Sequence, residues 1–339
     1  MRIFWVIKAK TLVFCLVACF ALLLVVYSLN FAVGEVFSRK PKYVVFLGQE
    51  LYPKDLDLHK QVERITESIN QQPEEARYDN VNKAVIPEVN GFEIDVAACV
   101  EAIKGAKRGE VVIPVWREIP PEMKLSDFAL FPVYQGNPVK NQVALVINVS
   151  WGNEYLEEML SILESNAVPA SFFLVGRWAE ENPELVKKIA ELGMDFGNHG
   201  YSDPHMQDQS PKEIEEEIIK TNKVVEELTA KKVRWFSPPY GEKAEKIYEV
   251  AADLGLHTIL WSLDTVDWQL PGEEVIIRRI VDNLHNGAII LMHPTEQTPG
   301  ALKAIIEGAR EKNLEFVTVS QLLDPSYWPA KYSALWAGN

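Results

Sequence analysis

The chain has 339 residues, of which 47% are hydrophobic and 24% are charged, a composition typical of globular proteins and sufficient for more than one folded part. Its formal net charge of -14 argues against a nucleic-acid partner, because phosphate binding needs clustered Lys and Arg side chains. The chain has 3 cysteines, two of them inside the first apolar segment, which excludes a disulfide scaffold and a cysteine-based zinc site.

The first predicted element is a transmembrane helix over residues 11–33, preceded by a cytoplasmic tail at 1–10. The segment is almost continuously apolar and is long enough to cross a bilayer. Basic residues precede it, which favours a single-pass protein whose remaining chain is extracytoplasmic. The alternative is a signal peptide cleaved near residues 32–34, in which case the protein would be secreted.

A small α/β module is predicted over residues 41–121, because its apolar residues follow strand and helix spacings in turn. Its expected elements are a strand at 43–47, a helix at 59–69, a strand at 92–96, a short helix around 100–103 and a strand at 111–115. Cys99 lies on an apolar helix face, where a thiol is expected to be a small buried hydrophobe. Residues 122–141 are rich in Pro and Gly and are predicted to form a linker.

A regular alternation of strands and helices is predicted over residues 142–323, followed by a tail at 324–339. Apolar runs of strand length occupy 143–149, 170–175, 194–198, 233–237, 257–263, 288–293 and 315–319. Helices are predicted at 182–192 and at 210–228, where Ser210 and Glu213 can cap the helix reciprocally. Seven strands alternating with helices predict a parallel sheet, either as a deformed (β/α)7 barrel or as an open doubly wound sheet.

Polar residues at the strand ends favour the barrel. Five of them stand at or just beyond the end of a different predicted strand: Asn148, His199, Ser237, Asp264 and His293. In a (β/α) barrel these ends converge on one mouth, where active sites are built. An open sheet gathers only a few such positions at its switch point. We therefore expect an α/β barrel that carries a site.

His199 and Asp203 form the first candidate site, a metal site. Their i, i+4 spacing would place both on one face of a helical turn, and a His with a carboxylate suits Zn²⁺ or a similar divalent ion. The alternative is a polar loop in which Asp203 shapes a turn before Pro204. His205 is expected to point elsewhere.

Two further motifs suit sugar binding and proton transfer. The sequence DTVDW at 264–268 places Trp268 beside carboxylates, an arrangement that suits a sugar surface. The sequence LMHPT at 291–295 places His293 at a strand end, where Asp267 would fix its tautomer and make it a plausible general acid. The alternative roles are structural: Trp268 as a cap on the barrel and His293 as a hydrogen-bonded rim residue.

Taken in order, these motifs resemble those of the NodB-like polysaccharide deacetylases, carbohydrate esterase family 4. The matching segments are VINVSWG, NHGYSD, SPPYG, DTVDW and LMHPT, within residues 142–323. The segments INVSWGNE and FFLVGRWAEENPEL are similar to the branch of this family found in endospore-forming bacteria, which implies a role in sporulation. Residues 90–121 are more weakly similar to a peptidoglycan-binding module.

The resemblance implies a deformed barrel that removes acetyl groups from N-acetylated sugars with a metal-bound water. In the half that makes the nucleophile, it implies that Asn148 takes the position of the catalytic base, Val149 that of the metal carboxylate, His199 and Asp203 those of the two metal histidines, and Ser237 that of the arginine that orients the base. In the other half, it implies that the Tyr240 backbone N–H binds the oxyanion and that His293 is the acid, tuned by Asp267. The residues implied around the sugar are Trp268, Leu291, Pro239 and Tyr240.

Four of these positions depart from the family pattern, all in the half that makes the nucleophile. Asn148 cannot accept a proton as a carboxylate does, and loss of a general base typically costs about 10² to 10⁴ in rate. Val149 offers no metal ligand, and Asp203 and Ser237 replace a histidine and an arginine. We therefore expect a membrane-anchored protein that engages N-acetylated cell-wall glycan of the peptidoglycan type, with weak or no hydrolysis and with zinc bound weakly or not at all.

Two other functions remain open at this point. One is an active metal-dependent deacetylase that uses a rearranged ligand set including His199 and Asp203. The other is a non-enzymatic wall-binding scaffold whose module at 41–121 recruits a partner.

Overall fold

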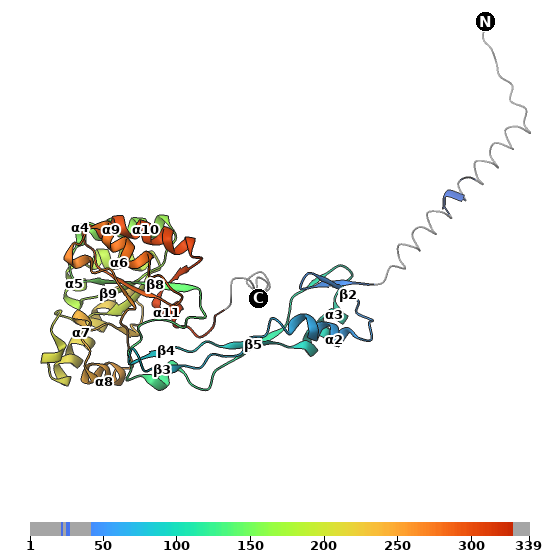
Figure 1. Cartoon of the computed structure of the whole chain (residues 1–339), viewed down its shortest axis with the longest axis horizontal. Helices are drawn as coiled ribbons and strands as arrows, with labels where there is room; N and C mark the ends of the chain where they lie inside the picture. Colours follow the sequence, from blue (N-terminus) through green and yellow to red (C-terminus); the bar gives the residue numbers. More distant parts are fainter. Residues whose placement is uncertain (1–21, 23–24, 28–41, 328–339) are drawn as a thin grey trace, which may run out of the picture. The chain divides into compact units, whose positions relative to one another are not determined.

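The computed structural model describes residues 22, 25–27 and 42–327 (Figure 1). These residues form two compact units. The smaller contains the described residues up to Ile69 together with Ile94–Val115, and the larger contains Asn70–Glu93 and the chain from Trp116 onwards. The predicted linker at 122–141 lies within the larger unit. Within the described ranges no helix has both the length and the apolar character needed to cross a bilayer, and most of the predicted anchor at 11–33 lies outside those ranges.

The smaller unit is a three-stranded sheet with two helices. Its elements are β1 (Val44–Phe46), β2 (Gln49–Leu51), α2 (Leu58–Thr66), α3 (Val96–Gly105) and β6 (Val111–Val112). Strand β1 is central, pairing antiparallel with β2 and parallel with β6. The Asp95 carboxylate caps α3 by accepting from the Ala98 N–H, and Cys99 is wholly buried in that helix, as expected. Burial raises the pKa of its thiol.

Four short strands lie in the same part of the sequence, of which the sequence indicated only the one at 92–96. Strand β3 (Arg77–Asp79) pairs antiparallel with β4 (Ala84–Ile86), and β5 (Gly91–Ile94) pairs with β7 (Trp116–Ile119). A three-residue strand such as β3 spans too few residues for a period of two to stand out from the surrounding chain.

The larger unit is built around a parallel sheet of eight strands, which confirms the predicted α/β class. The strands are β8 (Gln142–Val149), β9 (Ser171–Leu174), β10 (Asp195–Asn198), β11 (Trp235–Phe236), β12 (His257–Thr258), β13 (Leu263–Asp264), β14 (Ile289–Met292) and β15 (Glu315–Val317). They follow the order β12-β11-β10-β9-β8-β14-β13, and β15 pairs with the start of β8.

Helices alternate with these strands, as the sequence predicts. They are α4 (Asn153–Ser165), α5 (Gly176–Glu181), α6 (Pro183–Glu191), α7 (Pro211–Thr229), α8 (Glu245–Asp253), α9 (Glu273–Val281), α10 (Thr298–Glu311) and α11 (Val319–Leu322). The predicted cap of α7 is confirmed: Ser210 accepts from the Glu213 N–H, and the Glu213 carboxylate accepts from the Ser210 N–H at 2.8 Å.

The sheet is curled, and the predicted strand at 257–263 is the point at which its ends meet. That run is not one strand. It contains β12 and β13, which are the two ends of the strand order. The five steps from Thr258 to Leu263 span at most about 18 Å, so the two ends of the sheet lie close together. Val133, from the predicted linker, pairs with Ile259 in this gap.

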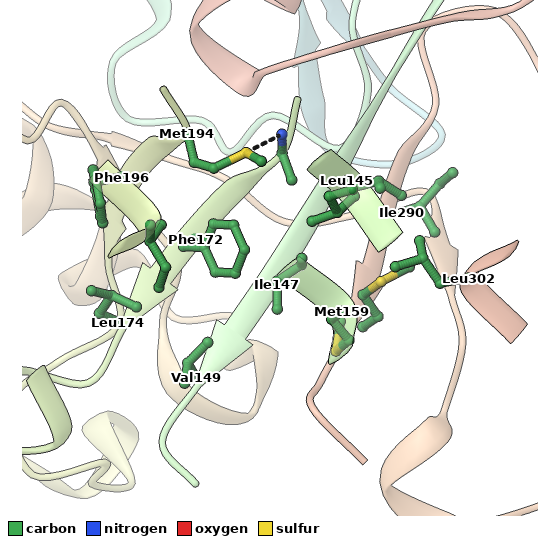
Figure 2. Close-up of a cluster of buried hydrophobic side chains, with 14 of the residues drawn as sticks. Leu145, Ile147, Val149, Met159, Phe172, Leu174, Met194, Phe196, Ile290 and Leu302 are labelled. Carbon is green, nitrogen blue, oxygen red and sulfur yellow. Dashed lines mark hydrogen bonds between the residues drawn. The ribbon is translucent and has the colours of Figure 1, made fainter. Parts of the chain in front are cut away.

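The main core lies between the sheet and its helices (Figure 2). Alternate side chains of β8 enter it, namely Leu145, Ile147 and Val149, all of them buried. They pack with residues such as Phe172 and Met159 in the same cluster. Successive side chains of a strand point to opposite faces. Asn148, which lies between Ile147 and Val149, therefore points to the other face, toward the inside of the curl.

Candidate functional site

A cavity of about 530 Å³ opens at the carboxyl ends of the parallel strands. It is lined by Asn148, Ser150, Trp151, His199, Asp203, Tyr240, Gly241, Trp261, Asp264, Trp268, Leu291 and His293. Three of these residues lie within strands, in β8, β13 and β14, and the others lie in segments that follow strands of the sheet. The sheet therefore brings together four of the five predicted polar strand-end residues, Asn148, His199, Asp264 and His293, whereas Ser237 is buried and is not among the residues that line the cavity.

Asp267 and His293 form a hydrogen-bonded pair in the site. Asp267 is wholly buried, and its Oδ1 accepts from His293 Nδ1 at 2.8 Å. Its Oδ2 accepts from the His293 backbone N–H at 2.7 Å and from the Thr298 hydroxyl at 2.8 Å. With Nδ1 donating to a carboxylate, His293 has its second ring nitrogen available for the cavity. Thr298, a third member that the sequence did not indicate, lies at the start of α10.

His199 is held by the strand beside it. Its Nδ1 lies 2.7 Å from the Ser237 backbone carbonyl, which fixes the proton on Nδ1 and leaves Nε2 as an acceptor in the neutral ring. Burial lowers the pKa of His199 from 6.5 to about 4, and the negative charge of Asp203 opposes this shift. The ring is therefore neutral at neutral pH.

The segment from His199 to His205 is a loop and not the helical turn that i, i+4 spacing would require. Asp203 nevertheless lines the cavity with His199. It has a φ of 60°, which Asp tolerates better than most residues, and its backbone carbonyl accepts from the Tyr240 hydroxyl at 3.3 Å. His205 is outside the cavity lining, as expected: its ring stacks on Tyr240 and its Nδ1 lies 2.8 Å from Glu242 Oε1.

The turn at Pro239–Gly241 contributes Tyr240 and Gly241 to the cavity lining. Tyr240 and Gly241 both have positive φ, 60° and 62°. A Cβ atom on Gly241 would lie 2.6 Å from Cη2 of Trp261, so only glycine allows the turn to approach that ring. Pro239 is buried beneath the turn and is not among the residues that line the cavity.

Aromatic rings form much of the remaining lining. Trp268 and Leu291 lie there as the sequence predicted, and Trp151 and Trp261 do so without having been predicted. The Trp151 ring is parallel to the His293 ring, with centroids 6.3 Å apart. Trp151 lies two residues beyond the end of β8, close to the predicted site residue Asn148, so its position alone was an available signal.

The donor set does not fit a catalytic metal held by three protein ligands. Val149 is packed in the core on the face opposite Asn148, and Asn148 offers only an amide. Among the residues that the structure describes, no three His, Cys, Asp or Glu side chains are grouped so as to hold a metal ion. Two buried polar atoms, Asn148 Oδ1 and Ser237 Oγ, have no hydrogen-bond partner in the described chain.

Comparison with known proteins places this site in a family. The polysaccharide deacetylase family model matches residues 135–259. A peptidoglycan-N-acetylglucosamine deacetylase of Bacillus cereus is 32% identical over 198 residues, which cover 57% of this chain and 72% of that protein. The chain belongs to the polysaccharide deacetylase family. Its parallel α/β sheet with the cavity at the strand ends is thus the deacetylase fold.

Two other proteins are similar over more of the chain. The uncharacterized protein YlxY of Bacillus subtilis is 39% identical over 252 residues, covering 74% of this chain and 79% of that protein. The crystal structure of BA3943 from Bacillus anthracis, described as a pseudoenzyme of carbohydrate esterase family 4, is 36% identical with a TM-score of 0.70, covering 80% of this chain and 96% of that one. A BA3943 mutant at 35% identity is described as having restored enzymatic activity.

Proposed function

We propose that this polysaccharide deacetylase binds cell-wall glycan of the peptidoglycan type and hydrolyses its N-acetyl groups weakly or not at all. The proposal rests on a difference between the acid and base positions of the site. Asp267 accepts three hydrogen bonds and orients His293 as an acid, whereas the base position, Asn148, has a carbonyl oxygen with no partner. The half of the site that protonates a leaving amine is complete, and the half that activates water is not.

The family roles of the remaining positions support this proposal. Trp268 and Leu291 line the cavity and would contact the sugar and its acetyl methyl group, and the Tyr240 backbone N–H would bind an oxyanion. His199 and Asp203 could together hold a divalent ion such as zinc only as two ligands, one fewer than a catalytic zinc usually has. The relatives also support a wall glycan, since one of them is a peptidoglycan-N-acetylglucosamine deacetylase.

We place the site outside the cell, in a deformed (β/α)7 barrel held at the membrane by the apolar segment at 11–33. The argument is the length of that segment and the basic residues before it. Fractionation of cells that produce the full chain, followed by protease treatment of intact protoplasts, tests this placement. Protection of the larger unit from the protease would contradict it.

Acetate release by the full chain in mild detergent tests the proposed function. We expect little or no acetate from N-acetylated chito-oligosaccharides or peptidoglycan. A quadruple variant, Asn148→Asp, Val149→Asp, Asp203→His and Ser237→Arg, is expected to release acetate with added zinc. A normal enzymatic rate from the wild-type chain would contradict the proposal.

A working deacetylase with rearranged ligands is the second candidate, favoured by the presence of His199 and Asp203 in one cavity. It predicts stoichiometric zinc in the wild-type chain. It also predicts that His199→Ala removes zinc and acetate release together. Metal analysis of the two proteins decides between the candidates.

A further inference from the structure

The cavity has a negatively charged lining. Asp203 and Asp264 both face it, and within the described chain no Lys or Arg is among the residues that line it. His293 is paired with the buried Asp267, so this pair adds no net positive charge even when the ring is protonated. Arg177 lines an adjoining hollow with Asp203, but Glu181 lines that hollow too, and no ion pair joins Arg177 to Asp203 in the described residues.

The cavity lining contains acceptor atoms that no group of the described chain satisfies. Asn148 is 4% exposed, and its Oδ1 has no donor in the described chain. His199 uses Nδ1 for the Ser237 carbonyl, which leaves Nε2 as an acceptor. The carboxylate of Asp203 adds further acceptor oxygens. Asn148 Oδ1 is itself buried, so a ligand in the cavity would meet mainly His199 Nε2 and the Asp203 carboxylate. Such a ligand must bring N–H or O–H donors, because a buried acceptor without a donor is costly.

Aromatic side chains also line the cavity. Trp151, Tyr240 and Trp268 are 45%, 61% and 56% exposed and line the cavity. Such rings stack on the apolar faces of sugars and attract cations over their faces. Asp264 is fixed nearby, because its Oδ2 accepts from Trp261 Nε1 at 3.2 Å and its Oδ1 accepts from the Val266 N–H at 2.8 Å.

We propose that the cavity binds the protonated free amine of a de-N-acetylated amino sugar in preference to the N-acetylated sugar. An ammonium group brings three donors and a positive charge, whereas an acetamide brings one N–H donor and no charge. The carboxylates therefore favour the free amine. This inference rests on the proposed function, because it assumes that a cell-wall glycan occupies the cavity, and it names the sugar within that glycan.

Calorimetric titration of the full chain in mild detergent tests the preference. The probes are a fully de-N-acetylated glucosamine tetrasaccharide and its fully N-acetylated counterpart, at mildly acidic pH where the free amine is protonated. We expect the free-amine probe to bind at least about tenfold more tightly, which corresponds to about 1.4 kcal/mol. The preference should shrink as salt rises, because ions screen the carboxylates.

Two variants locate the charge that causes the preference. Asp203→Asn keeps a side chain that tolerates positive φ and removes the charge. It should weaken binding of the free-amine probe about tenfold, whereas the affinity for the acetylated probe, which brings no charge, should fall by less. Asp208→Asn removes an exposed carboxylate outside the cavity lining and should change neither affinity. Circular dichroism of each variant establishes that it is folded.

The outcomes separate this inference from the proposed function. Equal affinity for the two probes, or preference for the acetylated one, overturns the inference and leaves glycan binding in place. Binding of neither probe overturns the proposed function and the inference with it. A free-amine preference that falls equally in the Asp203 and Asp208 variants is an effect of overall surface charge and also overturns the inference.

Discussion

Acidification is expected to destabilise the larger unit through His199. The pKa of this ring is lowered to about 4 in the folded chain, mainly by burial, and it returns to about 6.5 on unfolding. Between these two values the unfolded state binds more protons than the folded state. The free energy of unfolding therefore falls as the pH falls through this window.

The size of the effect follows from the two pKa values. Their difference corresponds to about 3 kcal/mol, since one pKa unit is worth about 1.4 kcal/mol, and most of this stability is lost by a pH of about 4.5. Urea unfolding followed by tryptophan fluorescence at neutral pH and at that lower pH measures the loss. Carboxylates and His257, whose pKa burial also lowers to about 4, add to the loss in every variant.

The contribution of His199 is isolated by His199→Gln, whose amide can still donate to the Ser237 carbonyl but does not titrate. We expect this variant to lose about 2–3 kcal/mol less on acidification than the wild type. His59→Gln, which replaces an exposed ring in the smaller unit, is the control. If His199→Gln loses as much stability as the wild type does, the argument from burial is refuted.

Two further changes test the geometry of the cavity. Asp267→Ala leaves the donors of His293 and Thr298 without an acceptor, so it should lower the free energy of unfolding by about 2–4 kcal/mol. An unchanged urea midpoint would contradict the hydrogen bonds described. Gly241→Ala should lower the melting temperature more than Gly255→Ala, because both have positive φ but only Gly241 approaches Trp261. Equal losses in thermal unfolding would show that this approach is not tight.

The sequence was sufficient to predict the fold class and many of the residues around the cavity. Residues 143–149 were predicted as a strand and form β8, and the reciprocal cap of α7 was predicted from Ser210 and Glu213. Such features depend on neighbours a few positions apart, so local spacing determines them. The convergence of Asn148, His199 and His293 was also predictable, because parallel strands place their carboxyl ends at one edge.

Other features depend on contacts between distant segments and appeared only in the tertiary structure. Residues 257–263 form the ends of a curled sheet and not one strand, because the curl brings β12 and β13 together. Trp261 lines the cavity, and Thr298 bonds Asp267, through contacts that no local period encodes. The sequence thus determined which side chains stand at the strand ends. The curl of the sheet decided which of them share a cavity, because the packing of the whole sheet against its helices sets its curvature.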